Sequence, residues 1–211
     1  MTRVHLSYIG AVATTIAMIC TSCSSSDTSQ TTSSETSSPT SSAVERSGPP
    51  TLTASELQPP SQDNQYTKDS GRPKVAFDPC TWIPDSTIQQ AGFDPRTRKR
   101  GEDQIAEITF LICHFDTPGK TLTVISGNAT WDEDLQKNGR WSEPVTINGR
   151  RGMQVKDPAL MGDCDIHLPT KAGFLDIGVG LTSDGKTQDL NPCDGLDAVA
   201  AAIEPSIGKG N

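Results

Sequence analysis

Cys23 is the thiol whose surroundings point most directly to a chemical role. The segment before it begins with the basic Arg3, continues as an apolar stretch from residue 6 to 19, and ends in two small residues. This layout is typical of a secretory signal peptide. A cysteine at the cleavage point is typical of a bacterial lipoprotein, in which the new N-terminal thiol is acylated. We therefore predict a lipoprotein signal peptide over residues 1–22 and lipidation of Cys23.

One position of this leader departs from the usual lipoprotein pattern. Cys20 stands where such cleavage sites usually carry Leu, and the bulky Ile19 makes Cys20 itself a poorer acceptor. The alternative is an ordinary cleaved signal peptide with a fully secreted product. A transmembrane anchor would need roughly 20 apolar residues, which the leader does not supply. Since two or more acyl chains hold a protein firmly on a bilayer, we expect lipid on Cys23 to anchor the chain at the extracytoplasmic face of the cell membrane.

Residues 23–76 have the composition of a disordered tether. Fifteen of the nineteen residues from 24 to 42 are Ser or Thr, and prolines recur through the rest of the segment. So few apolar side chains cannot offset the entropy lost on ordering. Ser, Thr and Pro together also favour O-glycosylation, although a plain spacer has the same composition. We therefore predict one folded domain at residues 77–211, an ordinary single-domain size.

The other four cysteines lie in the predicted domain, and their spacing favours disulfides. An even number of cysteines in an exported chain is typical of a disulfide framework. A zinc site would show pairs of ligands about two to four residues apart, whereas the separations here are 33, 51 and 29 residues. These residues are Cys80, Cys113, Cys164 and Cys193. We expect all four to be oxidised, which leaves the domain no thiolate nucleophile.

Four cysteines allow three pairings, and the residues before two of them favour one pairing. Asp78-Pro79-Cys80 and Asn191-Pro192-Cys193 are each typical of a helix start, with an N-cap and a first-turn proline. The other two cysteines lie in strand-like stretches. Joining each helix start to the strand nearest in sequence gives Cys80–Cys113 and Cys164–Cys193. Each bridge would stabilise the domain by about 3–4 kcal/mol on the chain-entropy model.

The domain has two histidines, His114 and His167, and neither stands in a recognisable catalytic motif. The sequence contains neither a G-x-S-x-G nucleophile motif nor a phosphate-binding loop. Each histidine follows a cysteine closely, so a metal site made of both histidines and Asp165 is conceivable. Strand alternation does not require them to meet, however, and we interpret them as solvent-facing strand residues. We expect no catalytic residue, no metal site and no cofactor.

Acidic and aromatic residues cluster between residues 131 and 141. Asp132-Glu133-Asp134 lacks the ligand spacing of a calcium-binding loop. We interpret it as a solvated helix start, where carboxylates interact favourably with the helix dipole. Trp131 and Trp141 flank this segment and are our candidate residues for a groove that binds a ligand or a peptide. Simple packing at the core or its rim is the alternative.

Hydrophobic periodicity predicts an α+β domain. Helices are expected at residues 84–91, 131–137 and 194–203, and Asn148-Gly149 favours a type I′ hairpin between two strands. The expected strands are residues 107–115, 121–124, 145–147, 153–155, 163–168 and 174–181. This order favours a mainly antiparallel sheet with helices packed on one face, stapled by two disulfides behind a disordered tether.

The charge of the domain argues against some classes of partner. It carries 13 Lys and Arg against 20 Asp and Glu, so neither nucleic acid nor an anionic bilayer surface is expected as its main partner. One basic run interrupts the acidic surface, and it consists of Arg96, Arg98, Lys99 and Arg100. We interpret it as a solvated loop, with a docking spot for an acidic partner as the alternative. We expect a monomer.

The chain resembles the DUF3558 family of actinobacterial lipoproteins, which includes mycobacterial members called LprB and LprC. Besides the leader and the Ser/Thr segment, the matching stretches are residues 77–80, residues 91–95, Cys113 with Phe115, Cys164, and Pro192-Cys193 before an Ala-rich helix. The resemblance implies a cell-envelope lipoprotein with two disulfides and an unassigned biochemical function. It implies no catalytic or binding residues.

Two classes of function remain open. We favour a non-catalytic envelope module that binds a partner protein, an envelope polymer or a small ligand. The alternative is an envelope hydrolase that acts on a cell-wall or glycan substrate through two carboxylates about 5–9 Å apart in a cleft. A deep pocket with converging buried carboxylates would favour the hydrolase. A shallow apolar groove beside Trp131 or Trp141 would favour binding.

Overall fold

The computed structural model describes residues 52–159, 162–209 and 211. The predicted signal peptide, the lipidation site Cys23 and the first part of the predicted tether lie outside the described residues. Within the described part of the chain, no helix is long and apolar enough to cross a membrane.

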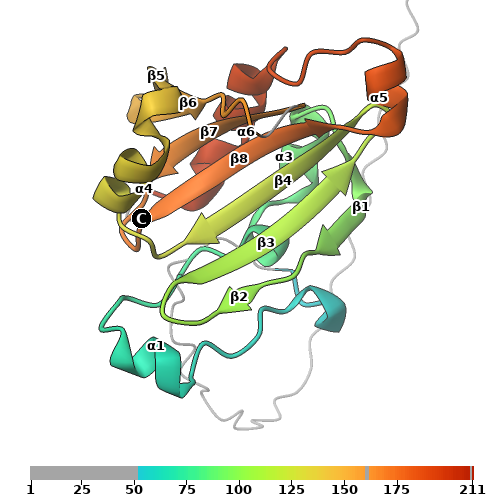
Figure 1. Ribbon diagram of the computed structural model, residues 1–211. Helices are drawn as coiled ribbons and strands as arrows, with labels where there is room; N and C mark the ends of the chain where they lie inside the picture. The colour runs from blue at the N-terminus through green and yellow to red at the C-terminus, as the bar shows by residue number, and fades with distance from the viewer. Residues whose placement is uncertain (1–51, 160–161, 210) are drawn as a thin grey trace, which may run out of the picture. The chain divides into compact units, whose positions relative to one another are not determined.

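An antiparallel sheet positions the other elements (Figure 1). Within the described residues it has eight strands, in the spatial order β1-β3-β4-β8-β7-β6-β5, with β2 also paired to β3. The strands are β1 Asp94–Arg100, β2 Gln104–Ile105, β3 Thr109–Asp116, β4 Lys120–Gly127, β5 Ser142–Ile147, β6 Arg150–Val155, β7 Asp163–Pro169 and β8 Phe174–Leu181. Each pairing of these strands is antiparallel, which confirms the predicted sheet type.

Side-chain alternation gives this sheet two chemically different faces. In β8, Leu175, Ile177 and Val179 belong to the hydrophobic core. Phe174 and Asp176 point to the opposite face because successive side chains of a strand alternate. The same alternation in the neighbouring strands places apolar side chains on the core face, where burying each one contributes about 1.5–3 kcal/mol. The opposite face is free to carry polar groups.

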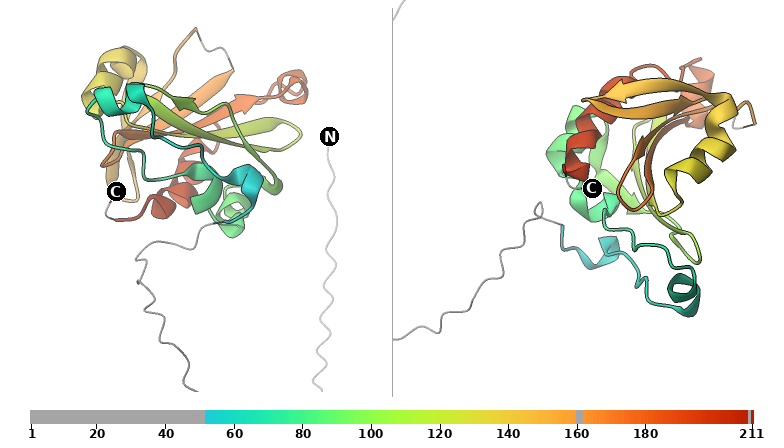
Figure 2. Two further views of the ribbon diagram at one scale, coloured as in Figure 1. Left: turned by 90° about the horizontal axis from the view of Figure 1, so that it is seen from below. Right: turned by 90° about the vertical axis from the view of Figure 1, so that its left-hand side faces the viewer.

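Helices α2 (Pro79–Trp82), α3 (Asp85–Gln90) and α6 (Leu196–Ile207) cover the core face. The Asp78 side chain accepts hydrogen bonds from the first amides of α2, as its N-cap position predicts. Helix α4 (Trp131–Asn138) lies across the sheet from α6, and Figure 2 shows the two helices on opposite sides. The prediction that helices pack on one face of the sheet is therefore confirmed for α2, α3 and α6, whereas α4 lies on the other face. Two short elements, η2 (Gly139–Trp141) and α5 (Ser183–Thr187), complete this part of the chain.

The hairpin between β5 and β6 has the backbone that its sequence predicts. Asn148 has φ of 48° and Gly149 has φ of 88°. Positive φ at both central positions is the requirement of a type I′ turn, and it matches the twist of the flanking strands. The turn sets the register in which Ile147 faces Arg150.

Two disulfides link the core helices to the sheet. Cys80 is bonded to Cys113 and Cys164 to Cys193, with Cα–Cα distances of 5.1 and 5.2 Å. These are the pairs that the helix-start motifs favoured. The first bridge attaches α2 to β3, and the second attaches the segment before α6 to β7.

The segment from residue 52 to 76 does not follow the prediction of a disordered tether. It contains η1 (Ser55–Leu57) and α1 (Gln65–Asp69), and its residue Val75 is buried. Gln62 exchanges two hydrogen bonds of 2.9 Å with the backbone of Val75, and Arg100 donates to the carbonyl of Leu57. The folded unit therefore begins before residue 77. These long-range partners compensate for the segment's low content of apolar side chains.

The basic run of residues 96–100 is strand β1 and not the solvated loop that we predicted. Arg96 is exposed, whereas the guanidinium of Arg98 is buried 4.8 Å from the ring centroid of Phe115. Arg100 is also buried and donates to Asp78 and Asp103, both of which are buried as well. Local composition alone could not reveal these partners because Asp78 lies 22 residues away.

The buried ion network around Arg100 generates a test of the fold. Arg100→Leu leaves the carboxylates of Asp78 and Asp103 buried without their cation, and we expect it to lower the free energy of unfolding by about 3–5 kcal/mol. Arg96→Leu removes an exposed ion pair, and we expect a loss below about 1 kcal/mol. Urea unfolding of both variants measures the difference. Equal losses would show that the buried network has no special structural role.

Candidate functional site

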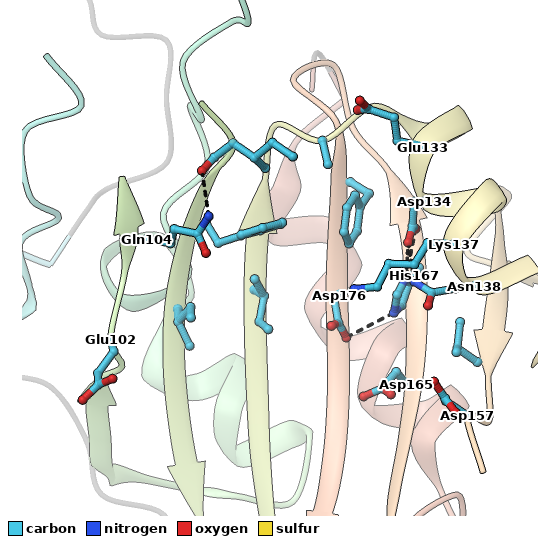
Figure 3. A pocket seen from close by; sticks show the side chains of 17 residues that line it. Glu102, Gln104, Glu133, Asp134, Lys137, Asn138, Asp157, Asp165, His167 and Asp176 are labelled. Carbon is cyan, nitrogen blue, oxygen red and sulfur yellow. Dashed lines mark hydrogen bonds and ion pairs between the residues drawn. The ribbon is translucent and has the colours of Figure 1, made fainter. Parts of the chain in front are cut away.

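A pocket of about 490 Å³ lies on the sheet face opposite α2, α3 and α6 (Figure 3). Strands β3, β4, β6, β7 and β8 contribute to its floor, and α4 forms one wall. Much of its lining is apolar, and these residues are Ile108, Phe110, Ile112, Ile125, Ala129, Val155 and Phe174. Its polar lining includes residues of α4, β7 and β8, and the full polar set is Glu102, Gln104, Glu133, Asp134, Lys137, Asn138, Asp157, Asp165, His167 and Asp176.

The register of β7 and β8 brings the central polar groups together. His167 of β7 lies directly opposite Asp176 of β8, and Asp165 lies opposite Gly178. Asp165 and His167 are two residues apart on one strand, so both side chains point to the pocket face. Figure 3 shows these side chains beside one another on the two strands.

Helix α4 adds a third carboxylate from above the sheet. Thr130 begins the helix with a capping box to Glu133, which fixes its first turn. Arg72 then binds Glu133 through two hydrogen bonds of 2.6 and 2.7 Å. This attachment presents Asp134 to the sheet, where its Oδ1 accepts a 2.7 Å hydrogen bond from Asn138.

His167 is buried between two carboxylates and an aromatic ring. Its Nδ1 lies 2.8 Å from Oδ2 of Asp134, and its Nε2 lies 3.7 Å from Oδ1 of Asp176. The imidazole stacks on Phe174 with 5.2 Å between ring centroids. Only 4 % of His167 is exposed to solvent, so the histidine forms a direct link between α4 and the sheet.

Burial and mutual repulsion alter the protonation of these groups. Burial first, and then the charge of Asp176, raises the pKa of Asp165 to about 7, although His167 opposes the change. Burial also raises the pKa of Asp176. For His167, burial lowers the pKa, but the carboxylates of Asp176 and Asp134 outweigh that effect and raise it above 6.5. A positive His167 is thus stabilised by the acids around it.

One carboxylate oxygen in this group is left without a hydrogen bond. Oδ1 of Asp176 is buried and has no hydrogen-bond partner among the described residues. A buried unsatisfied acceptor is destabilising by about 1–3 kcal/mol, and more when it is charged. Asp176 also lines the pocket and its side chain is 19 % exposed, so a bound donor would be stabilised by this carboxylate.

Gly178 makes room for the two strand carboxylates. A Cβ atom at this position would clash with Oδ1 of Asp165 and would lie 3.6 Å from Oδ1 of Asp176. Both carboxylates therefore lie close to the backbone of Gly178. Any other residue here would displace Asp165 from the pocket floor.

A family model described as a protein of unknown function, DUF3558, matches residues 18–206. The chain belongs to the DUF3558 family. No curated protein and no solved structure matches it. The description of the family assigns no activity, so the function of this DUF3558 chain must be inferred from the pocket itself.

The prediction of solvent-facing histidines is wrong for His167, which is buried. His114 is half-buried, and its Nδ1 lies 3.0 Å from Oγ1 of Thr123. Strands β4 and β8 separate the two histidines in the sheet, so the conceivable site of both histidines with Asp165 does not form. Among the described residues, no group of three or more His, Cys, Asp or Glu is arranged to hold a metal ion.

The prediction of a solvated acidic helix start is wrong for Asp134. Its side chain is buried against His167, because this face of α4 packs on the sheet. Glu133 is partly exposed, and its salt bridge to Arg72 with the Thr130 hydrogen bonds lowers its pKa to about 2. The neighbouring acids of α4 therefore have different roles.

The two candidate groove residues, Trp131 and Trp141, are not equivalent. Trp131 lines a second hollow of about 770 Å³, together with Leu135, Pro144 and Met153. Trp141 is half-buried beside it, and the guanidinium of Arg140 lies 4.7 Å from its ring centroid. The main pocket shares no lining residue with this hollow, and the polar groups of the main pocket are absent from it.

The chain carried one usable signal for the site. Asp176 is the charged residue on a strand face that otherwise carries Phe and Gly, and Asp165 and His167 share a face of the preceding strand. Pairing β7 and β8 as a hairpin with residues 170–173 in the loop places His167 opposite Asp176. Asp134 could not have been found in this way because it comes from a helix 33 residues away.

Stability should fall with rising pH because of Asp165. Its pKa in the folded chain, about 7, exceeds the ordinary 3.8. The contribution of Asp165 to the free energy of unfolding is therefore complete below pH 4 and is lost as the pH rises from 4 to 7. We expect Asp165→Asn to be more stable than the wild type at pH 8, by on the order of 2–4 kcal/mol, and similar to it at pH 4. Thermal and urea unfolding across this range measure the difference.

Asp184→Asn is the control for this prediction, since Asp184 is exposed on α5. We expect its stability to follow that of the wild type at every pH. A wild type and Asp165→Asn that keep the same difference in stability from pH 4 to 8 would contradict the assignment.

Proposed function

We propose that this DUF3558 chain is an exported lipoprotein whose domain binds a small ligand in the pocket between α4 and the sheet. The observation that carries the binding role is the pocket, with apolar walls on one side and the unsatisfied carboxylate of Asp176 on the other. Its volume of about 490 Å³ falls in the range of roughly 300–1,000 Å³ that small-molecule sites occupy. A few polar groups in an apolar cavity orient a ligand and provide specificity.

The pocket is held in shape before a ligand arrives. Its floor consists of hydrogen-bonded strands, and α4 is attached at two points, by Arg72 to Glu133 and by Asp134 to His167. A preformed site avoids the entropy cost of ordering side chains on binding. This geometry suits recognition of one ligand shape.

Lipidation and cellular location are the second part of the proposal. The basic and apolar leader, the cysteine at residue 23 and the Ser/Thr-rich segment support lipidation of Cys23 and a location at the extracytoplasmic face of the cell membrane. We also propose that the chain is an actinobacterial lipoprotein similar to LprB. Tethering keeps the binding domain at the membrane, where a partner protein of the envelope would recognise the ligand-bound domain.

A hydrolase is the second candidate, because the pocket does contain close carboxylates. Asp165, with its pKa near 7, could donate a proton at neutral pH. Glycosidases, however, place their two carboxyl groups on either side of the scissile bond. Here Asp165 and Asp176 come from neighbouring strands of one wall, while Asp134 and Glu133 of α4 are already paired with His167 and Arg72. The arrangement therefore suits binding better than cleavage.

Lipidation can be tested by labelling cells that express the full chain with a fatty-acid precursor. We expect label on the wild type, none on Cys23→Ala, and undiminished label on Cys20→Ala if its leader is still cleaved. Cys23→Ala should also move from the membrane fraction to the soluble fraction. Equal label on the wild type and Cys23→Ala would contradict the proposed anchor.

Ligand binding can be tested by filling the pocket. Ile125 lies opposite Asp176 on the pocket floor, and Ile125→Trp should occupy the cavity without removing a charged group. In a ligand-observed NMR screen of small organic molecules, we expect hits for the wild type that bind at least tenfold more weakly, about 1.4 kcal/mol, to this variant. Lys156→Trp, at an exposed position, is the control.

Hits that bind equally to Ile125→Trp would place the ligand site elsewhere and contradict the proposal. Release of sugar fragments from cell-wall material by the wild type, and its loss in Asp165→Asn, would instead favour the hydrolase.

A further inference from the structure

The polar lining of the pocket contains more acidic than basic residues. Two of its acids are neutralised, since Glu133 binds Arg72 and Asp134 binds His167. The remaining acidic lining residues are Glu102, Asp157, Asp165 and Asp176. Lys137 is the remaining basic residue of this lining. The pocket therefore attracts cations and repels anions.

Two of these acids meet over the backbone of Gly178. Asp165 and Asp176 both approach the backbone there, and Oδ1 of Asp176 accepts no hydrogen bond from the described residues. Its nearest cation, Nε2 of His167, is 3.7 Å away, which is beyond hydrogen-bond length. A positively charged group beside the Asp176 carboxylate, whose side chain is 19 % exposed, would relieve the repulsion between the two acids.

The remaining lining indicates that the cation is organic. A hard metal ion takes six or more oxygen ligands, whereas the groups around this position include Phe174, Ile125 and Val155. Phe110 and Phe174 pack edge to face with 6.2 Å between centroids, and aromatic faces attract ammonium groups. An apolar body attached to the cation would cover these side chains.

We infer that the ligand of this pocket is a small organic cation, an ammonium group on a compact apolar body, with the ammonium placed against Asp176 and Asp165. This inference rests on the proposed binding function and names its ligand class. Neutral analogues lack the charge that the acids attract, and carboxylate analogues are repelled by them.

Binding of such a cation should release protons. Asp165 is partly protonated near neutral pH, and a bound ammonium favours its ionised form. The groups that also face it are Asp163 and His167 of β7, Asp176 of β8, Asp134 and Lys137 of α4, and Asp157 after β6. The affinity for the cation should therefore rise between pH 6 and 8, because a larger fraction of Asp165 is already ionised before the cation binds.

Four probes that share a phenyl ring test the inference on the wild-type chain purified without its leader. They are benzylamine, benzyltrimethylammonium, benzyl alcohol and benzoate. By NMR titration and calorimetry at pH 7, we expect the two cations to bind at least about tenfold more tightly than the alcohol, and benzoate not to bind. Calorimetry in buffers of different ionisation enthalpy should show net proton release for the cations.

Two isosteric variants locate the ammonium. Asp176→Asn and Asp165→Asn should each weaken binding of the cations at least about tenfold, and Asp165→Asn should remove most of the proton release. Asp184→Asn removes a remote negative charge and should change neither the affinity for the cations nor the proton release. A thermal melt establishes that each variant is folded, and if Asp176→Asn is unfolded, Asp165→Asn and the proton release on the wild type decide the matter.

The outcomes separate this inference from the proposed function. Benzyl alcohol or benzoate binding as tightly as the cations, with loss in Ile125→Trp, would overturn the cation class and keep the pocket function. Cation binding that survives Asp165→Asn and Asp176→Asn would overturn the inference as well. Absence of binding by both cations would overturn the inference, and absence of any pocket ligand in the wider screen would overturn the proposed function.

Discussion

The hydrogen bond between Asp134 and His167 holds α4 over a face of the sheet that the core helices do not cover. Together with the Arg72–Glu133 ion pair, this bond fixes the wall that α4 forms over the pocket. The register of β7 and β8 already places His167 opposite Asp176, so with Asp134 and Asp165 three acids surround one imidazole. The shape of the pocket therefore depends on this contact, whereas burial and the charge of Asp176 raise the pKa of Asp165.

Two groups of buried charges in the domain differ in how completely they are paired. Around β1, Arg100 satisfies Asp78 and Asp103 with short hydrogen bonds. In the pocket, Asp176 retains an oxygen without a hydrogen-bond partner in the described structure. Buried ions need close partners to offset their desolvation. The first group therefore serves the fold, and the incomplete second group is the better candidate for a binding role.

Much of the sheet could be predicted because its signals are local. Alternation in residues 174–181 and the Asn148-Gly149 turn each depend only on neighbouring residues, and both have the predicted conformation. The site could be predicted only in part. Asp165 and His167 lie two residues apart in a predicted strand, but the sequence analysis interpreted His167 as solvent-facing, because its burial depends on α4, whose position the sequence alone does not specify. Strand β1 and the ordered residues 52–76 were missed for the same reason, since distant partners stabilise them.

The sequence by itself determined the α+β class, the strand faces and the cysteines available for bridging, because these depend on residue type and short-range periodicity. The tertiary structure decided which polar residues meet and how much water reaches them. Asp134, Asp165, His167 and Asp176 come from three separate elements, and ordinary surface residues become a binding site only when folding brings them together away from solvent. Desolvation is a property of that assembled environment, so it cannot be inferred from any one of the segments.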